Sequence, residues 1–356
     1  MIRDAIQGIS FPMGYVFFFL MAAFGALLIP FSDRAFEGAS EGLRTFTYQV
    51  APSLFPFTVC ACFFTRSGKA DPGKLRPALR YPAAAFFSAV CGTPSAAMIC
   101  GMVCPGDAGM ASALCAVCNQ AGPMFIVSTL SSAFFGDRSL ALPLALSHYL
   151  PAFSGSLILC AFGARRGSHD EKLSSPPPPS SASAFTGAIS EAVTAMLRVC
   201  GTIVFFRTAQ AVAEPLLLPG APAIIKGAAA GAFEMTNGLR LVSLAGNTRN
   251  ALTLASFILS FGGICLFAQS KLIYTELRAG PYFAAKAATG ALSALTFWLL
   301  YPRFYRTAAV FGFTGERTAD LLRGSAEAGA AAAGFALSAA LCLLCSFTAS
   351  RLFKKS

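Results

Sequence analysis

Apolar runs of about twenty residues recur along this chain, and they restrict its fold more than any other feature. An α-helix of roughly 20 residues spans the hydrocarbon core of a bilayer. Only 12% of the 356 residues are charged, about half the share found in soluble domains. The sequence therefore predicts an all-α, polytopic integral membrane protein with about eight to ten transmembrane segments. The runs lie at 11–31, 43–64, 81–104, 110–135, 139–163, 187–213, 250–270, 283–301 and 329–349, with a weaker one at 221–237.

The positive charge of the chain is concentrated in short loops between these runs. The net charge is +11, and Lys and Arg gather in stretches such as 66–80 and the tail "RLFKKS". We expect them to face the cytoplasm and anionic lipid, so membrane lipid is an expected partner and nucleic acid is not. The run at 11–31 has no small-residue cleavage site after it, which favours a membrane helix over a signal peptide.

This charge pattern also predicts a topology. If 66–80 and 164–172 are both cytoplasmic, an even number of crossings must separate them, yet three apolar runs lie between. We therefore expect the chain around Gly92–Ser95 to be re-entrant. A simple inverted repeat would instead require an odd number of crossings in each half.

The twelve cysteines indicate packing rather than a metal site or a disulfide framework. Pairs such as Cys115-x-x-Cys118 lie inside apolar runs, where Cys behaves as a small apolar residue. A structural zinc site needs four ligands, and the two histidines, His148 and His169, are not spaced to complete one. We expect no metal and no cofactor.

A charged and Pro/Ser-rich stretch at 164–184, "ARRGSHDEKLSSPPPPSSASA", divides the chain into a first half (1–163) and a second half (185–356). Its composition is typical of an extended linker. The halves contain similar markers in the same order: "PSLFPF" and "GTIVFF", then "CGTPSAAM" and "GAFEMTNG", then "CNQAGPMFI" and "SFGGICLFAQ". Thr93 precedes Gly122 by 29 residues, and Glu234 precedes Gly263 by 29. The sequence thus predicts two structural repeats with broken or re-entrant helices.

Polar and helix-breaking residues interrupt the third marker of each half. Unwound backbone at membrane depth is tolerated only where protein or a water-filled cavity satisfies it, and transporters bind solutes and ions at such breaks. The alternative is a kinked helix whose amides bond only to neighbouring helices. On the transporter interpretation the candidate substrate-binding residues of these two markers are Asn119, Gln120, Gly122, Pro123, Gly262, Gly263 and Gln269.

Glu234 is the most informative single residue, because a carboxylate inside a membrane segment is costly and indicates function. It could bind a cation, carry a proton, or cap the turn at Thr236–Gly238. The alternative is an interfacial position in which Glu234 is solvated or pairs with Lys226 or Arg240. Thr93 and Ser95 occupy the matching place in the first half, and with Asn237 they complete the candidate site. We expect Asn119, Gln120, Glu234, Asn237 and Gln269 to converge on one polar cavity.

"PSLFPF", "GTPS", "NQAGPMFI", "FEMTNG" and "FGGICLFAQ", in this order, resemble the YlbJ-type sporulation integral membrane proteins over roughly residues 45–300. One departure is Ala96, which stands where the family pattern has Gly. The resemblance implies two nucleoside-recognition, or Gate, domains, a place in the outer forespore membrane and a role in spore cortex formation. It also implies movement of dipicolinic acid from mother cell towards forespore. Arg198 or Arg207 could then bind this small dicarboxylate, and nucleosides remain an alternative cargo.

The sequence lacks the common motifs of catalytic sites. It contains no paired acids, no His-rich metal set and no Gly-x-Ser-x-Gly motif, so we expect no enzyme and no catalytic residues. The expected function is transport of a small polar or anionic solute. The alternative is a structural or assembly protein of the sporulation membrane. Oligomerisation is left open.

Overall fold

The structure is a computed structural model that describes residues 13–66, 77–92, 95–104, 106–165 and 181–310. Every regular element in these ranges is helical, which confirms the predicted all-α class. Five helical stretches are long and apolar enough to cross a bilayer, in agreement with a polytopic membrane protein. They are Ser32–Phe63, Arg138–Gly163, Ala182–Leu217, Arg249–Ile273 and Ala279–Pro302.

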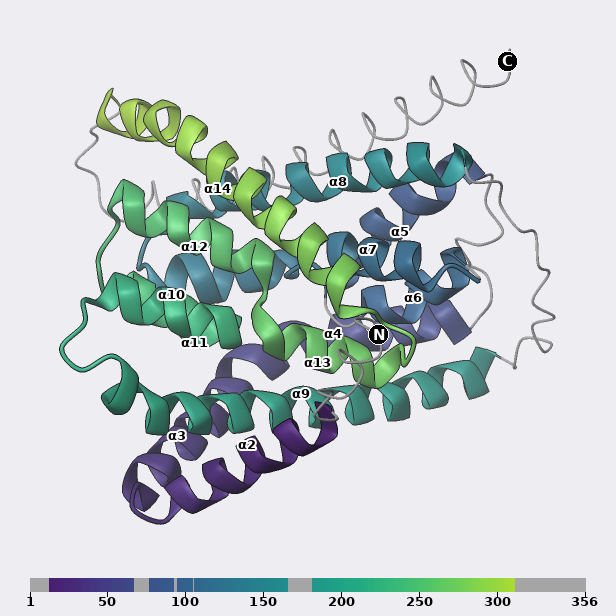
Figure 1. The fold of residues 1–356 in the computed structure, drawn as a ribbon. Coiled ribbons are helices and arrows are strands. Elements are labelled where there is room, and N and C mark those ends of the chain that lie inside the picture. Colours follow the sequence, from purple (N-terminus) through teal and green to yellow (C-terminus); the bar gives the residue numbers. More distant parts are fainter. Residues whose placement is uncertain (1–12, 67–76, 93–94, 105, 166–180, 311–356) are drawn as a thin grey trace, which may run out of the picture.

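The elements of the first half precede the linker, and those of the second half follow it (Figure 1). The first half contains α2 (Met13–Leu28), α3 (Ser32–Thr45), the π-helix η2 (Phe46–Val50), α4 (Ala51–Arg66), α5 (Pro77–Cys91), α6 (Ser95–Val103), α7 (Ala108–Cys118), the π-helix η4 (Phe125–Phe134), the short 3₁₀ turn η5 (Arg138–Leu140) and α8 (Ala141–Arg165). The second half contains α9 (Ser181–Leu217), α10 (Ala223–Phe233), α11 (Met235–Ser243), α12 (Arg249–Phe261), α13 (Gly263–Ile273) and α14 (Ala279–Val310).

Four of the expected apolar runs are broken into shorter helices rather than forming one continuous helix each. The run at 81–104 is divided into α5 and α6, that at 110–135 into α7 and η4, that at 221–237 into α10 and the start of α11, and that at 250–270 into α12 and α13. The described residues therefore contain fewer full-length membrane helices than the eight to ten expected crossings. The expected run at 329–349 lies outside the described residues.

Two of these broken runs fold back on themselves. α10 packs along α11, and α5 packs against α6. By contrast, α12 and α13 follow one another with Gly262 between them, as do α7 and η4 around residues 119–122. Each half thus contains a folded-back helix pair followed by a broken helix. This arrangement is compatible with the expected repeats and with re-entry at Gly92–Ser95, and both remain predictions.

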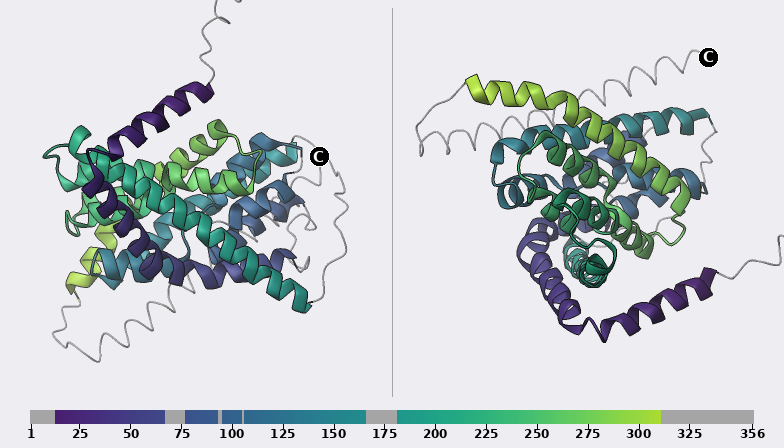
Figure 2. Two further views of the ribbon diagram at one scale, coloured as in Figure 1. Left: turned by 90° about the horizontal axis from the view of Figure 1, so that it is seen from below. Right: turned by 60° about the vertical axis from the view of Figure 1, so that its left-hand side comes forward.

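Figures 1 and 2 show how the long helices are arranged around the bundle. The long helix α9 runs across the bundle, α14 crosses α12 on the opposite side, and α2 lies at the periphery against α9. Large apolar side chains on the outer helices are exposed, for example Phe18 on α2 and Leu197 on α9. Such a surface is unusual for a soluble monomer and fits contact with lipid tails.

Small and hydroxylated residues allow the helices in the interior to approach closely. The hydroxyls of Ser147 on α8, Ser256 on α12 and Ser293 on α14 form a chain with O–O distances of 2.8 Å. Membrane helices use such residues at their contacts because no hydrophobic force drives them together in lipid. The buried cysteines Cys115 and Cys118 pack in the same core, as expected from their spacing.

Candidate functional site

Glycine contacts join the folded-back pair of each half to the break in the helix that follows. A Cβ on Gly92, between α5 and α6, would lie 3.3 Å from the backbone nitrogen of Gly122. A Cβ on Gly263, at the α12–α13 break, would lie 2.8 Å from the carbonyl oxygen of Phe233, at the end of α10. Gly92 and Gly122 are thirty residues apart, as are Phe233 and Gly263. The same kind of backbone approach therefore occurs in both halves.

Gly262 and Gly263 make the second break possible, since both have a φ of +77°. Side chains with a Cβ rarely adopt this left-handed conformation, so two consecutive glycines end α12 sharply and start α13 in a new direction. In the first half, Pro123 occupies the first helical position after the break, where its missing N–H costs nothing.

The two breaks open on one cavity between α4, α9 and the tip of the α10–α11 pair. Gly122 and Ala121 contribute from the first half, and Glu234, Gly262 and Gln269 contribute from the second. The remaining wall is largely apolar and comes from six helices, η2, α4, η4, α9, α11 and α13, with Val50, Leu54, Phe125, Val199, Ile203, Met235, Thr236, Cys265 and Leu266. Four candidate residues, Gly122, Glu234, Gly262 and Gln269, thus line one cavity although they are far apart in sequence.

Glu234 lies at the tip of the α10–α11 pair and is only 4% exposed. Its two carboxylate oxygens accept hydrogen bonds from the backbone N–H groups of Thr236 and Asn237, each at 2.7 Å. The carboxylate therefore caps the N-terminus of α11, where negative charge is favourable. Neither ion pair of the interfacial alternative forms, because Lys226 pairs with Glu214 at 2.9 Å and Arg240 pairs with Glu41 at 3.2 Å. The depth of Glu234 in the membrane stays a prediction.

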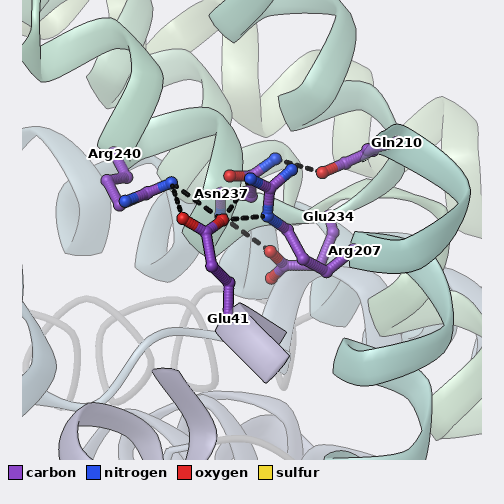
Figure 3. A network of polar contacts seen from close by, with 6 residues as sticks. All are labelled: Glu41, Arg207, Gln210, Glu234, Asn237 and Arg240. Carbon is purple, nitrogen blue, oxygen red and sulfur yellow. Dashed lines mark hydrogen bonds and ion pairs between the residues drawn. The ribbon is translucent and has the colours of Figure 1, made fainter. Parts of the chain in front are cut away.

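A charged cluster lies beside this tip (Figure 3). The carboxylate of Glu41 on α3 accepts hydrogen bonds from Arg207 on α9 and from Arg240 on α11, the latter at 3.2 and 3.3 Å. A second, smaller cavity lies between Arg207, Arg240, Glu234 and Asn237. Both cavities share Glu234 as a wall, so the cluster continues the site outward from the breaks.

The position of Glu41 depends on close packing of α3 against α9. A Cβ on Gly38 would lie 2.7 Å from the Cβ of Ala211, and one on Gly42 would lie 3.0 Å from the Cα of Val204. Any larger side chain at these positions would push α3 away from α9. Glycine on both sides of Glu41 therefore allows its carboxylate to reach Arg207.

Asn237 is buried beside the cluster. Its side-chain nitrogen donates to Gln210 on α9, and its side-chain oxygen has no hydrogen-bond partner among the described residues. A buried, unpaired amide oxygen is costly and is usually explained by a bound water or ligand. Asn237 is thus available to a polar ligand in the smaller cavity.

Asn119 and Gln120 do not line either cavity. The side-chain nitrogen of Asn119 donates to Ser270 at 2.8 Å and to Tyr282 at 3.0 Å, and that of Gln120 donates to the carbonyl of Val117 at 3.0 Å. Both residues are buried. Of the five groups expected to converge on one cavity, Glu234 and Gln269 line the larger cavity, Asn237 lines only the smaller one beside it, and these two residues line neither.

The unwound backbone at 119–122 is satisfied by side chains from α8 and α14. Lys286 donates to the carbonyl of Asn119 at 2.6 Å. The N–H of Ala121 donates to Nε2 of His148 at 3.1 Å, and the O–H of Tyr149 donates to the Ala121 carbonyl at 2.8 Å. These bonds meet the requirement that non-helical backbone at membrane depth be satisfied by protein.

The other candidate residues have less defined places. Thr93 lies outside the described residues, and Ser95 begins α6. Gly263 does not line the cavity but packs against the backbone of Phe233, and Pro123 is half-buried. Arg198 is exposed on α9, so of the two arginines expected to bind an anion only Arg207 lies beside a cavity.

Sequence reasoning missed Glu41, Arg240, His148 and Lys286. His148 and Lys286 lie inside expected membrane segments, so the reasoning that selected Glu234 could have found them. Glu41 lies just before an apolar run, where an acid is ordinary, and no local signal distinguishes it. Arg240 was considered only as a partner of Glu234.

Comparison with curated proteins shows a similarity over most of the chain. The chain is 25% identical over 330 residues to the sporulation integral membrane protein YlbJ of Bacillus subtilis (strain 168). The alignment covers 79% of this chain and 81% of that protein. No family model matches the chain, and no solved structure matches it.

Proposed function

We propose that this chain, a YlbJ-type sporulation integral membrane protein, transports a small anionic solute across a membrane of the sporulating cell. One observation supports this most strongly: the helix breaks of both halves meet at a single cavity that also contains a buried carboxylate. Transporters bind their substrates where broken helices meet near the bilayer midplane. Glu234 at the tip of a folded-back pair, beside the Gly262 break, fits that construction.

The charged cluster supports an anionic cargo. Arg207 and Arg240 together hold the carboxylate of Glu41, so their guanidinium groups are spaced to bind one carboxylate from both sides. A carboxylate of the solute could replace Glu41 in this position. The side-chain nitrogen of Gln269 offers a further donor deeper in the larger cavity, although it is bonded to Thr202 at 2.8 Å in this structure.

Dipicolinic acid is the cargo that fits these features best. It combines two carboxylates with a flat ring, and the larger cavity offers apolar contacts from Val199, Ile203 and Leu266. The direction from mother cell to forespore, the outer forespore membrane, the role in cortex formation and the two Gate domains rest on the family resemblance. The alternatives are a nucleoside as cargo, or a structural role in spore assembly.

Nucleoside transport is favoured by a separate observation. Glu41 and Glu234 balance Arg207 and Arg240, so the four charges around the smaller cavity sum to zero as long as Glu41 stays in place. A neutral, hydrogen-bonding solute would not have to displace Glu41. The two cargoes therefore differ in what they require of this carboxylate.

The test is uptake of radiolabelled dipicolinate and of a nucleoside panel into proteoliposomes that contain the purified protein. We expect dipicolinate uptake that Arg207→Gln reduces about tenfold or more, because a hydrogen bond to a charged group contributes roughly 1.5–3 kcal/mol and ~1.4 kcal/mol corresponds to tenfold. Arg198→Gln is the matched control, since Arg198 is exposed on the same helix. Uptake of nucleosides alone would support the alternative cargo, and no uptake by correctly inserted protein would refute transport.

A further inference from the structure

Lys286 on α14 is a buried cation in the middle of the bundle, with only 1% of its surface exposed. Its ammonium nitrogen donates to the carbonyl of Asn119 at 2.6 Å and to the carbonyl of Ser260 at 3.1 Å. Within the described part of the chain these acceptors are both backbone carbonyls. A buried lysine is costly unless its charge is compensated, so the negative partner must come from the backbone.

The two carbonyls belong to the ends of the two broken helices. Asn119 is the residue that ends α7, and Ser260 lies in the last turn of α12, just before Gly262. Carbonyls at a helix C-terminus have no partner within the helix and carry the partial negative charge of the helix dipole. The ammonium group therefore lies between two partial negative charges, one from each half of the chain.

In transporters with broken helices, unwound carbonyls and the C-terminal ends of half-helices coordinate the coupling cation. Here this position already contains a cation of the protein. Asn119 also has a side-chain oxygen that is buried and has no hydrogen-bond partner among the described residues. Ser260 adds a hydroxyl, which lies 2.7 Å from Nδ1 of His148. Besides the two carbonyls that Lys286 binds, the Asn119 side-chain oxygen and the Ser260 hydroxyl therefore lie on the same two residues.

We propose that the Lys286 ammonium is a built-in substitute for an inorganic coupling cation at the junction of the α7 and α12 helix ends. The site in the native protein accepts no Na⁺ or other alkali cation, because Lys286 occupies it. Removing the side chain would leave two backbone carbonyls facing the space that the ammonium group occupied, and carbonyl oxygens of this kind coordinate Na⁺ in transporters. The consequence that solute flux needs no bound alkali cation rests on the proposed transport function, whereas the occupancy of the site does not.

The experiment measures thermal unfolding of the purified full-length chain in detergent. The salts are NaCl, LiCl and KCl, each compared with N-methyl-D-glucamine chloride at equal ionic strength. We expect the midpoint of the native protein to be the same in all four salts. Lys286→Ala should unfold at a lower temperature in N-methyl-D-glucamine chloride and regain stability saturably with Na⁺ or Li⁺, since a ligand that binds only the folded state stabilises it.

Lys286→Met is the matched control, because it removes the charge but fills most of the space. We expect it to gain no stability from any alkali cation. A saturable rise for native protein in Na⁺, or no cation response of Lys286→Ala, would overturn the proposal. If Lys286→Ala does not fold, binding of ²²Na⁺ to the native protein decides, and saturable binding would overturn the proposal.

Flux provides an independent measurement. Dipicolinate uptake by native protein should be equal with Na⁺ and with N-methyl-D-glucamine in the external buffer, and uptake that requires Na⁺ would contradict the proposal. If native protein transports nothing, the proposed function fails, and the unfolding measurements still decide whether Lys286 occupies a cation site.

Discussion

The capping of α11 by Glu234 gives a quantitative prediction for Glu234→Gln. Both carboxylate oxygens accept a backbone N–H at 2.7 Å, and the side chain is 4% exposed. The glutamine amide has nearly the same shape but only one oxygen. Its oxygen can keep one of the two hydrogen bonds. Its NH₂ group then faces the second backbone N–H, and because both groups are donors no hydrogen bond can form between them.

The expected loss of stability follows from that mismatch. A buried N–H without a partner costs about 1–3 kcal/mol. The lost negative charge at the N-terminus of α11 adds about 0.3–1 kcal/mol. Burying a neutral amide costs less than burying a carboxylate, which offsets part of this. We therefore expect the free energy of unfolding to fall by about 1–2 kcal/mol.

The assay combines unfolding in mixed detergent micelles with flux per inserted molecule across pH. Glu214→Gln is the control, because Glu214 pairs with Lys226 at a position one-third exposed, and such a pair contributes little. If the charge of Glu234 takes part in the transport cycle, Glu234→Gln also loses nearly all flux while it still inserts. A free energy of unfolding equal to that of native protein would refute the two-bond cap. Flux and pH dependence equal to those of native protein would refute a role in the cycle.

Two further substitutions test the surroundings of this tip. Glu41→Gln removes the carboxylate that neutralises the two guanidinium groups, so the KM for dipicolinate should fall. The fall should be up to about fivefold, the equivalent of ~1 kcal/mol for a partly exposed pair. An unchanged or higher KM would show that Glu41 does not compete with the solute. Gly238→Ala would place a Cβ 2.3 Å from the Cα of Gly231 and should force α10 and α11 apart, lowering the unfolding free energy by about 1–3 kcal/mol. The control Gly201→Ala meets no atom within 4 Å and should be neutral or slightly stabilising, and equal behaviour of the two variants would contradict the close packing.

The sequence alone was sufficient for those features that depend on local chemistry and length. Apolar runs long enough to cross a bilayer, with few charges between them, leave helices as the only stable form for an open chain in lipid. The breaks are equally local. Gly262 and Gly263 adopt a φ that other residues avoid, and Pro123 starts a helix after unwound backbone. For the same reason Glu234, an acid beside a turn, could be selected before its contacts were known.

Only the tertiary structure determined which polar groups meet. Asn119 at the end of α7 and Glu234 at the tip of the α10–α11 pair are both polar groups where a helix ends. Asn119 nevertheless bonds to Ser270 and Tyr282, whereas Glu234 lines the cavity. Glu41 meets Arg207 across 166 residues, and Lys286 meets Asn119 across 167. A polar group in a membrane must be satisfied, but many partners in a chain could satisfy it. Packing of whole helices selects among them, because the glycine contacts that bring α3 to α9 and α10 to α11 also fix which side chains can reach each other.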